Sequence, residues 1–246
     1  FYLGSVAELQ EDFEKALPFY VRVQTGTYAT AAQVRVAHIL AELGRLDAAL
    51  AHLERRRDAF PDEDVALSEA EASILSDSGR IRDALKAYDE AIKRHPDSRS
   101  LRFSRSFLLE RENRVSEALA ELTMLLEEQP DDPVALNALG YTLADRTDEY
   151  QRAFEYISRA LEQIPNDAAI IDSMGWVHYR LGNNEEALKY LRQAYDLTQD
   201  PEVAAHLGEV LWVQGEVEEA QSIWEQALLD HPDHEKLRDT IQRFLP

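Results

Sequence analysis

The sequence of 246 residues contains no cysteine. This absence excludes disulfide frameworks, cysteine-ligated zinc, iron–sulfur clusters and thiol nucleophiles. The sequence also has no uninterrupted apolar run of about 18 residues, which is the length that a membrane-spanning helix requires. Its first residues lack the basic, apolar and small-residue regions of a secretory signal peptide. We therefore predict neither a transmembrane helix nor a cleaved leader within these residues.

Positively charged residues are scarce. The chain has 26 Lys and Arg against 47 Asp and Glu, which gives a formal net charge of −21. A surface that binds nucleic acid or an anionic membrane needs clustered Lys and Arg to displace counterions. The composition therefore argues against both ligands and favours basic partners. With 45% hydrophobic residues, the chain still has enough apolar side chain to bury a core.

Motifs of enzymes are also missing. The seven histidines are scattered along the chain and form no His-Glu-x-x-His pattern. There is no Gly-x-Ser-x-Gly nucleophile elbow, no phosphate-binding glycine loop and no dinucleotide fingerprint. We predict that this chain has no catalytic activity, no metal site and no cofactor.

An internal repeat organises the sequence. One alanine recurs at intervals of 33 to 35 residues, and in most repeats it is followed by Leu or Phe. A fixed period of this length is the signature of repeat proteins, in which each unit is one supersecondary element. The recurring alanines are Ala16, Ala49, Ala84, Ala118, Ala153, Ala187 and Ala220.

Each period reads as two helices joined by a turn. Glycines at 44, 79, 182 and 215 mark the turn, because glycine adopts the left-handed conformation that ends a helix. Prolines at 61, 96, 130, 165 and 232 lie 12 residues after a repeat alanine and end the second helix. The Asp or Asn after the proline, as at Asp131 and Asn166, is expected to cap the next helix. Each repeat is therefore predicted to be a helical hairpin.

Small residues are predicted at the contacts between the two helices of a hairpin, where they allow axes to approach within roughly 8–10 Å. Large apolar residues flank these positions, and no single hairpin can bury them alone, so neighbouring hairpins must stack. The predicted repeat anchors pair a first-helix glycine with a second-helix alanine: Gly140 with Ala153, Gly175 with Ala187, and Gly208 with Ala220.

The spacing and these residues resemble tetratricopeptide-repeat proteins, most closely at 136–141 (LNALGY), 171–179 (IDSMGWVHY) and 205–208 (AHLG). Ala37, Ala72 and Ser106 replace the glycine in the middle repeats. The resemblance implies an all-α, right-handed superhelix that forms a single solenoid over 1–246. We expect a partial repeat at 1–26, six full repeats at about 30–233 and a capping helix at about 234–244, within a fragment of a longer protein.

The resemblance further implies that first helices line the inner, concave face and that the residue after the glycine position points towards it. Aromatic residues stand there or one turn away, with acidic residues beside them, which would suit a peptide with basic side chains. The alternative is that some of these rings pack between hairpins. The predicted partner-binding residues are Phe103, Phe107, Tyr141, Asp145, Asp172, Trp176, Tyr179, Glu209 and Trp212.

A narrower resemblance lies in residues 135–182. The sequence of this segment is similar to that of bacterial tetratricopeptide proteins of the cell envelope, including the outer-membrane lipoprotein that partners a carboxyl-terminal processing protease. It implies a protein-interaction adaptor that binds this serine protease and brings it peptidoglycan hydrolases. It also implies a periplasmic location, with membrane contact only through an upstream lipid anchor. A cytoplasmic location, a self-assembling scaffold and the regulatory arm of a larger enzyme, such as a glycosyltransferase, stay open.

Overall fold

The computed structural model describes residues 1–245, which form fifteen α-helices and no β-strand. The all-α prediction is confirmed. Among these residues, no helix is both long enough and apolar enough to cross a membrane. The chain divides into two compact units, Phe1–Asn113 and Arg114–Pro246, and each is described by itself.

Unit 1 consists of α1 (Tyr2–Glu8), α2 (Phe13–Val21), α3 (Ala29–Glu42), α4 (Leu46–Ala59), a 3₁₀ turn (Pro61–Glu63), α5 (Asp64–Asp77), α6 (Ile81–Arg94) and α7 (Arg99–Arg111). Unit 2 consists of α8 (Val115–Glu128), α9 (Pro133–Arg146), α10 (Tyr150–Gln163), α11 (Ala168–Arg180), α12 (Asn184–Thr198), α13 (Pro201–Gln214), α14 (Val217–Asp230) and α15 (Glu235–Phe244).

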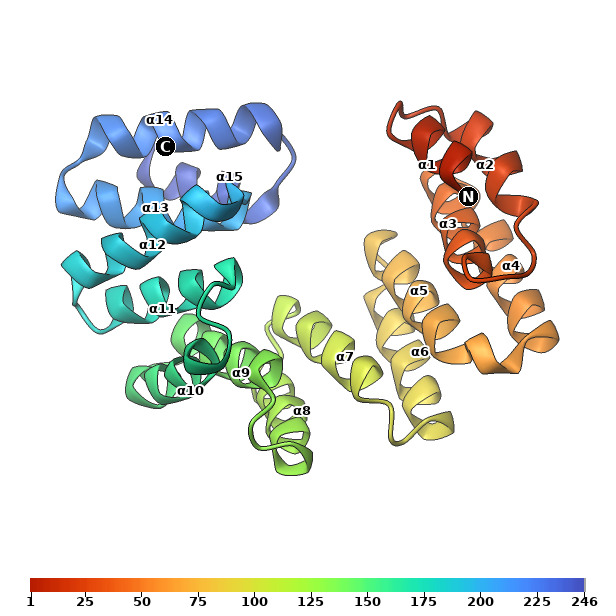
Figure 1. The fold of residues 1–246 in the computed structure, drawn as a ribbon, viewed down its shortest axis with the longest axis horizontal. Coiled ribbons are helices and arrows are strands. Elements are labelled where there is room, and N and C mark those ends of the chain that lie inside the picture. The colour runs from red at the N-terminus through yellow and green to blue at the C-terminus, as the bar shows by residue number, and fades with distance from the viewer. Residues whose placement is uncertain (246) are drawn as a thin grey trace. The chain divides into compact units, whose positions relative to one another are not determined.

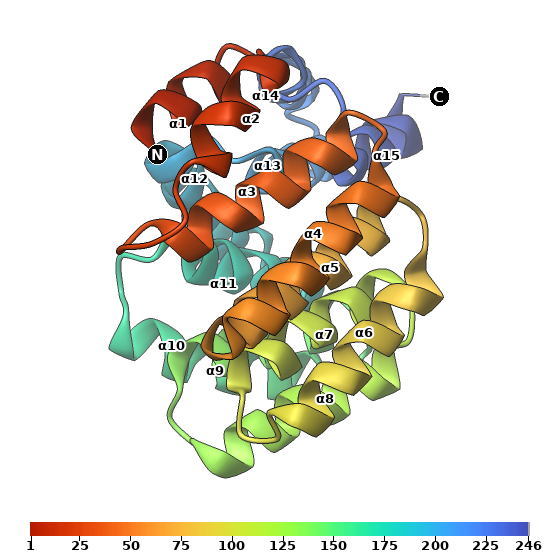
Figure 2. The ribbon, with the colours of Figure 1, turned by 90° about the vertical axis from the view of Figure 1, so that its right-hand side faces the viewer.

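Consecutive helices pair as hairpins within each unit. In unit 1, α3 packs against α4 and α5 against α6, and α3 also contacts α5 (Figures 1 and 2). In unit 2, α9 packs against α10, α11 against α12 and α13 against α14 (Figure 1). The first helices α9, α11 and α13 touch in succession, so hairpins within a unit stack as predicted.

The turns inside the hairpins have the predicted backbone. All four turn glycines have positive φ, for example Gly79 at +74° and Gly215 at +86°, a region where a Cβ atom is unfavourable. Asn113 takes the same left-handed conformation, with φ of +56°, in the turn after α7, which has no glycine. Asparagine is among the few other residues that tolerate it.

The predicted helix caps are wrong by one residue. The side chain of Asp132, not Asp131, accepts hydrogen bonds from the first turn of α9, and Asp167, not Asn166, accepts one from α11. The residue directly after the proline belongs to the turn in both cases. The next residue has the extended backbone of an N-cap, which is the conformation from which an Asp side chain reaches the free N–H groups.

The two helices of these hairpins approach closely at the predicted glycines, where a larger side chain would clash. A Cβ atom added at Gly140 would lie 2.6 Å from Ile157 Cγ1 and 3.0 Å from the backbone oxygen of Ala153. One at Gly175 would lie 2.6 Å from Leu191 Cγ, and one at Gly208 would overlap the indole of Trp224. All seven repeat alanines are fully buried: Ala16, Ala49, Ala84, Ala118, Ala153, Ala187 and Ala220.

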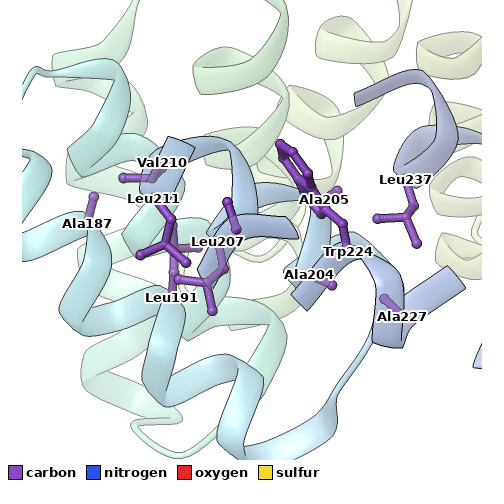
Figure 3. Close-up of a cluster of buried hydrophobic side chains, with 11 residues drawn as sticks. Ala187, Leu191, Ala204, Ala205, Leu207, Val210, Leu211, Trp224, Ala227 and Leu237 are labelled. Carbon is purple, nitrogen blue, oxygen red and sulfur yellow. The ribbon is translucent and has the colours of Figure 1, made fainter. Parts of the chain in front are cut away.

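The C-terminal helix α15 closes the core of unit 2. Leu237 is fully buried, and Phe244 packs against the same cluster, which includes Trp224 from α14 and Leu211 from α13. Figure 3 shows Leu211 beside Leu191 and Leu207 in this cluster. Glu235, Arg238 and Asp239 of α15 are exposed, whereas Lys236 and Arg243 bind carboxylates of α13.

An ionic cluster around the buried Asp64 connects the hairpins of unit 1. The Asp64 carboxylate, at the start of α5, lies 2.6 Å from Arg57 Nε of α4 and 2.7 Å from Arg94 Nε. Burial opposes ionisation of Asp64, but Arg94, His95 and the Ser68 hydroxyl outweigh it and hold the pKa of Asp64 well below its ordinary value. The cluster therefore stays ionised and ties α4, α5 and α6 together.

Replacing Gly140 tests the close helix contact. Gly140→Val places a branched side chain against Ile157 and the α10 backbone, and overpacking of this kind costs about 1–3 kcal/mol. We expect a lower melting temperature by circular dichroism. Ala120→Val, on the exposed face of α8, is the control and should change stability by no more than about 0.5 kcal/mol. Equal melting temperatures for the two variants would show that the predicted contact is not close.

Candidate functional site

Trp176, a predicted partner-binding residue, lies between the first helices α9 and α11. Only 5% of its surface is exposed. Its indole N–H donates to Asp145 Oδ1 at 3.1 Å, and Arg180, one turn later, donates to the backbone oxygen of Asp145 at 3.2 Å. Two of the predicted partner-binding residues, Trp176 and Asp145, therefore bind each other, and the indole lies between α9 and α11.

His206 of α13 completes this arrangement. Its ring stacks on the indole of Trp176, with centroids 4.2 Å apart and planes inclined by 20°. Its Nδ1 atom lies 2.9 Å from Oδ2 of Asp172, and both side chains are almost fully buried. The sequence predicts Asp172 as an acidic residue of the partner-binding face, but its carboxylate binds a histidine of the next repeat.

Tyr141 of α9 connects this helix with the capping helix α15 through side-chain contacts. Its hydroxyl donates to Glu202 Oε1 at 2.7 Å, and Lys236 of α15 donates to the same oxygen at 2.6 Å. The Lys236 ammonium also contacts the Tyr141 hydroxyl and lies 4.9 Å from the centroid of its ring. A lysine from the capping helix thus occupies the face that the sequence assigns to a partner.

The electrostatics of this contact are well defined. Burial alone would raise the pKa of Glu202, but the Lys236 ammonium and the His206 ring outweigh it and lower the pKa of Glu202 to about 2. Burial, together with the Glu202 carboxylate, raises the pKa of Tyr141 well above its ordinary value. Tyr141 therefore remains a hydrogen-bond donor and Glu202 an acceptor at any physiological pH.

The remaining predicted residues of unit 2 also have partners within the chain. The Tyr179 hydroxyl donates to Glu209 Oε1 at 3.4 Å, and Arg243 of α15 donates to Glu209 Oε2 at 2.6 Å. The Trp212 ring packs against Trp224 and Phe244, with centroids 5.7 and 5.9 Å away. Trp212 is therefore part of the C-terminal core, in agreement with the alternative that some rings pack inside.

Unit 1 holds the predicted pair Phe103 and Phe107 on α7. Their rings meet edge to face with centroids 4.8 Å apart, and 50% of the Phe107 surface is exposed. Phe107 borders a pocket of about 190 Å³ between α5, α6 and α7. The lining residues are Ala72, Ser73, Ser76, Asp77, Tyr88, Ser104, Phe107, Leu108 and Arg111.

The polar groups of this pocket are only partly used by the chain. The Ser73 hydroxyl donates to Asp77 Oδ2 at 3.3 Å, and the Arg111 guanidinium donates to the Ser76 hydroxyl. Asp77 and Arg111 form no ion pair with each other. The pocket therefore presents a carboxylate, a guanidinium and an exposed aromatic ring on the first-helix side of unit 1.

The structure thus gathers Tyr141, Asp145, Asp172 and Trp176 into one network in unit 2, while Phe103 and Phe107 stand in unit 1. Their role in binding a partner stays a prediction. The sequence reasoning did not identify His206, Glu202 or Lys236. A signal was present, since complementary residues lie one repeat apart: Asp172 and His206, Glu202 and Lys236, Glu209 and Arg243 are each separated by 34 residues. Within residues 1–245, no three His, Asp or Glu side chains gather as a metal ion would require.

Four models of the tetratricopeptide repeat match the sequence. They cover residues 29–55, 69–133, 131–200 and 178–243. The matches overlap or adjoin over most of the chain and include α9, α11 and α13, whose residues form the network around Trp176.

Relatives and solved structures agree with these matches. A TPR repeat-containing protein of Pseudomonas aeruginosa is 43% identical over 209 residues, which are 85% of this chain and 35% of that protein. A tetratricopeptide repeat protein from Parabacteroides merdae superimposes with a TM-score of 0.73 over 97% of this chain and 94% of its own, at 15% identity. PilW, a type IV pilus biogenesis factor, gives a TM-score of 0.63 over 88% of this chain and all of its own, at 17% identity. The two solved structures support the fold alone.

The ion pair of Glu202 predicts an acid-dependent stability difference. A carboxylate whose pKa is lowered by folding stabilises the native state above its ordinary pKa and loses this effect as the pH falls to the native value. Glu202→Gln should therefore have a lower melting temperature than the parent near pH 7. The difference should shrink below the ordinary pKa of 4.5 and vanish near the lowered pKa of about 2.

The matched control is Glu225→Gln, because Glu225 is exposed on α14. Its melting temperature should follow that of the parent throughout the same pH series. A Glu202→Gln difference that stays constant down to the lowered pKa would contradict the assigned contact.

Proposed function

This chain belongs to the tetratricopeptide-repeat family, and on that premise we propose that it is an adaptor of the bacterial cell envelope. The repeats of the family form protein-interaction scaffolds. The adaptor holds a carboxyl-terminal processing protease and brings it substrates such as peptidoglycan hydrolases. Proteolysis belongs to the partner, because this chain supplies surfaces rather than a nucleophile and its base.

Two observations support the adaptor role. The segment 135–182 is similar in sequence to tetratricopeptide proteins of the bacterial envelope, and a bacterial TPR repeat-containing protein is 43% identical over 209 residues. This chain spans about a third of the length of that relative. The periplasmic location and the upstream lipid anchor are therefore proposals about the whole protein, and they rest on the resemblance.

The observation that carries the binding role is the difference between the first-helix residues of the two units. In unit 2, Trp176, Asp172 and Glu209 are buried and bound to other residues of the chain. In unit 1, the Phe107 ring is half exposed and borders a pocket. Exposed aromatic rings contribute a large apolar area at a low entropy cost and are enriched among residues that dominate binding. We therefore assign the first contact with the partner to α5 and α7.

Charge supports the same proposal. Unit 2 has 10 Lys and Arg against 27 Asp and Glu, whereas unit 1 has 16 against 20. A surface with an excess of one charge attracts oppositely charged partners over long distances and accelerates their association. A basic surface of the partner would be attracted by unit 2 and held by specific contacts of unit 1.

Capture from a bacterial envelope extract tests the adaptor role. The parent chain should enrich a processing protease or a cell-wall hydrolase, identified by quantitative mass spectrometry. Phe107→Ala should reduce this enrichment at least tenfold, because loss of a central aromatic contact costs about 2 kcal/mol or more of binding free energy.

Val213→Ala is the matched control. Val213 is 50% exposed on α13, so its truncation removes an apolar side chain of similar exposure outside the proposed contact. The control should retain the parent's enrichment. If no protease or hydrolase is captured, the adaptor role is wrong, and if Phe107→Ala captures as much as the parent, the contact is misplaced.

A further inference from the structure

The pocket of unit 1 has a counterpart in unit 2 at the same place in the repeat. Asp77 and Asp145 lie at the end of a first helix, 68 residues apart in the sequence, which is two repeats. Phe107 and Trp176 stand on the following first helix, 69 residues apart, and Arg111 and Arg180 have the same separation. The additional residue lies in the turn between α9 and α10, where the sequence is one residue longer. Both sites therefore combine an aspartate, an aromatic residue and an arginine.

In unit 2 this site is filled by the chain itself. The indole of Trp176 lies between α9 and α11 and donates its N–H to Asp145. Arg180 donates to the Asp145 backbone and to the Tyr150 hydroxyl at 2.7 Å. The half-buried Asp145 carboxylate thus accepts from a flat, neutral ring at one oxygen, and its other oxygen lies 3.1 Å from Arg146 Nε.

In unit 1 the corresponding ring is smaller and has no donor. Phe107 is 50% exposed, and Asp77 accepts a hydrogen bond from Ser73, four residues earlier on its own helix. A volume of about 190 Å³ remains between α5, α6 and α7. Unit 1 therefore has the aspartate and the arginine of this site without the indole.

We propose that this pocket binds a tryptophan side chain of a partner protein, with the indole N–H donating to Asp77 and the ring packing against Phe107. The assignment of the indole to a partner rests on the proposed scaffold function. It deepens that function by naming the chemistry of the partner's anchoring residue.

The charges of the pocket favour a neutral donor over a charged one. An acidic side chain would meet the Asp77 carboxylate, and a basic side chain would meet the Arg111 guanidinium, which donates to the Ser76 hydroxyl. An indole satisfies the carboxylate without placing a charge beside the guanidinium. Its edge-to-face contact with Phe107 adds attraction beyond the buried area.

A small probe tests the pocket without any partner protein. N-acetyl-tryptophanamide is titrated into the whole chain, and backbone amide shifts are followed by NMR. We expect saturable shifts at Ser73, Asp77 and Phe107, with a dissociation constant on the order of millimolar, as is usual for a ligand of this size. The derivative methylated on the indole nitrogen should bind about fivefold more weakly, because it lacks the hydrogen bond.

Two variants and a control complete the test. Phe107→Trp should fill the pocket as Trp176 does in unit 2 and weaken binding of the probe at least tenfold. Asp77→Asn should weaken it severalfold, because a hydrogen bond to a charged acceptor is stronger than one to a neutral acceptor. Asp97→Asn, at an exposed position before α7, should bind like the parent.

Shifts that are absent from the pocket, or unchanged by indole methylation and by Phe107→Trp, would overturn the proposal. Such a result would leave the capture of a protease unaffected. Conversely, a failed capture experiment would not change the affinity that is measured between the pocket and the probe.

Discussion

The structure depends on one helix–helix contact that recurs every 33 to 35 residues. At each hairpin a first helix with a minimal side chain lies directly against a second helix, and at Gly140 the space for a Cβ atom is occupied by Ile157 and the Ala153 backbone. This contact sets the distance between the two helices. The distance in turn decides which large side chains interdigitate, and it leaves each hairpin with apolar residues that only the neighbouring hairpin covers.

Much of the fold could be predicted because this contact leaves a pattern in the sequence. The buried alanines, the turn glycines with positive φ and the residue types of the core are all visible in the period. The predicted caps are one residue early because the residue after each proline is equally polar whether it belongs to the turn or caps the helix. Only the backbone conformation distinguishes Asp131 from Asp132.

The candidate site was less predictable for a different reason. The residue after the glycine position is aromatic in both units, but its exposure depends on what the neighbouring repeats offer. Trp176 finds Asp145 on one side and His206 on the other, whereas Phe107 has no N–H to donate and stays half exposed. Pairs separated by one repeat, such as Asp172 and His206, carry this information, and a search for local motifs does not detect them.

These differences between repeats distinguish the two units. Unit 2 uses the side chains of its first helices to bind its own repeats and its capping helix, through Lys236 and Arg243. Unit 2 is also the more acidic of the two. Unit 1 is closer to neutral and retains a pocket with unused hydrogen-bonding capacity beside an exposed ring. A repeat protein can thus divide structural support and recognition between equivalent positions of different repeats.

The central claim is that a partner engages α5 and α7 rather than the filled network of unit 2. Hydrogen–deuterium exchange of the whole chain, alone and saturated with a purified carboxyl-terminal processing protease, tests it most directly. The account predicts slower exchange at residues 72–77 and 104–111 in the complex. Protection confined to α11 and α13, with no change at α5 and α7, would contradict it.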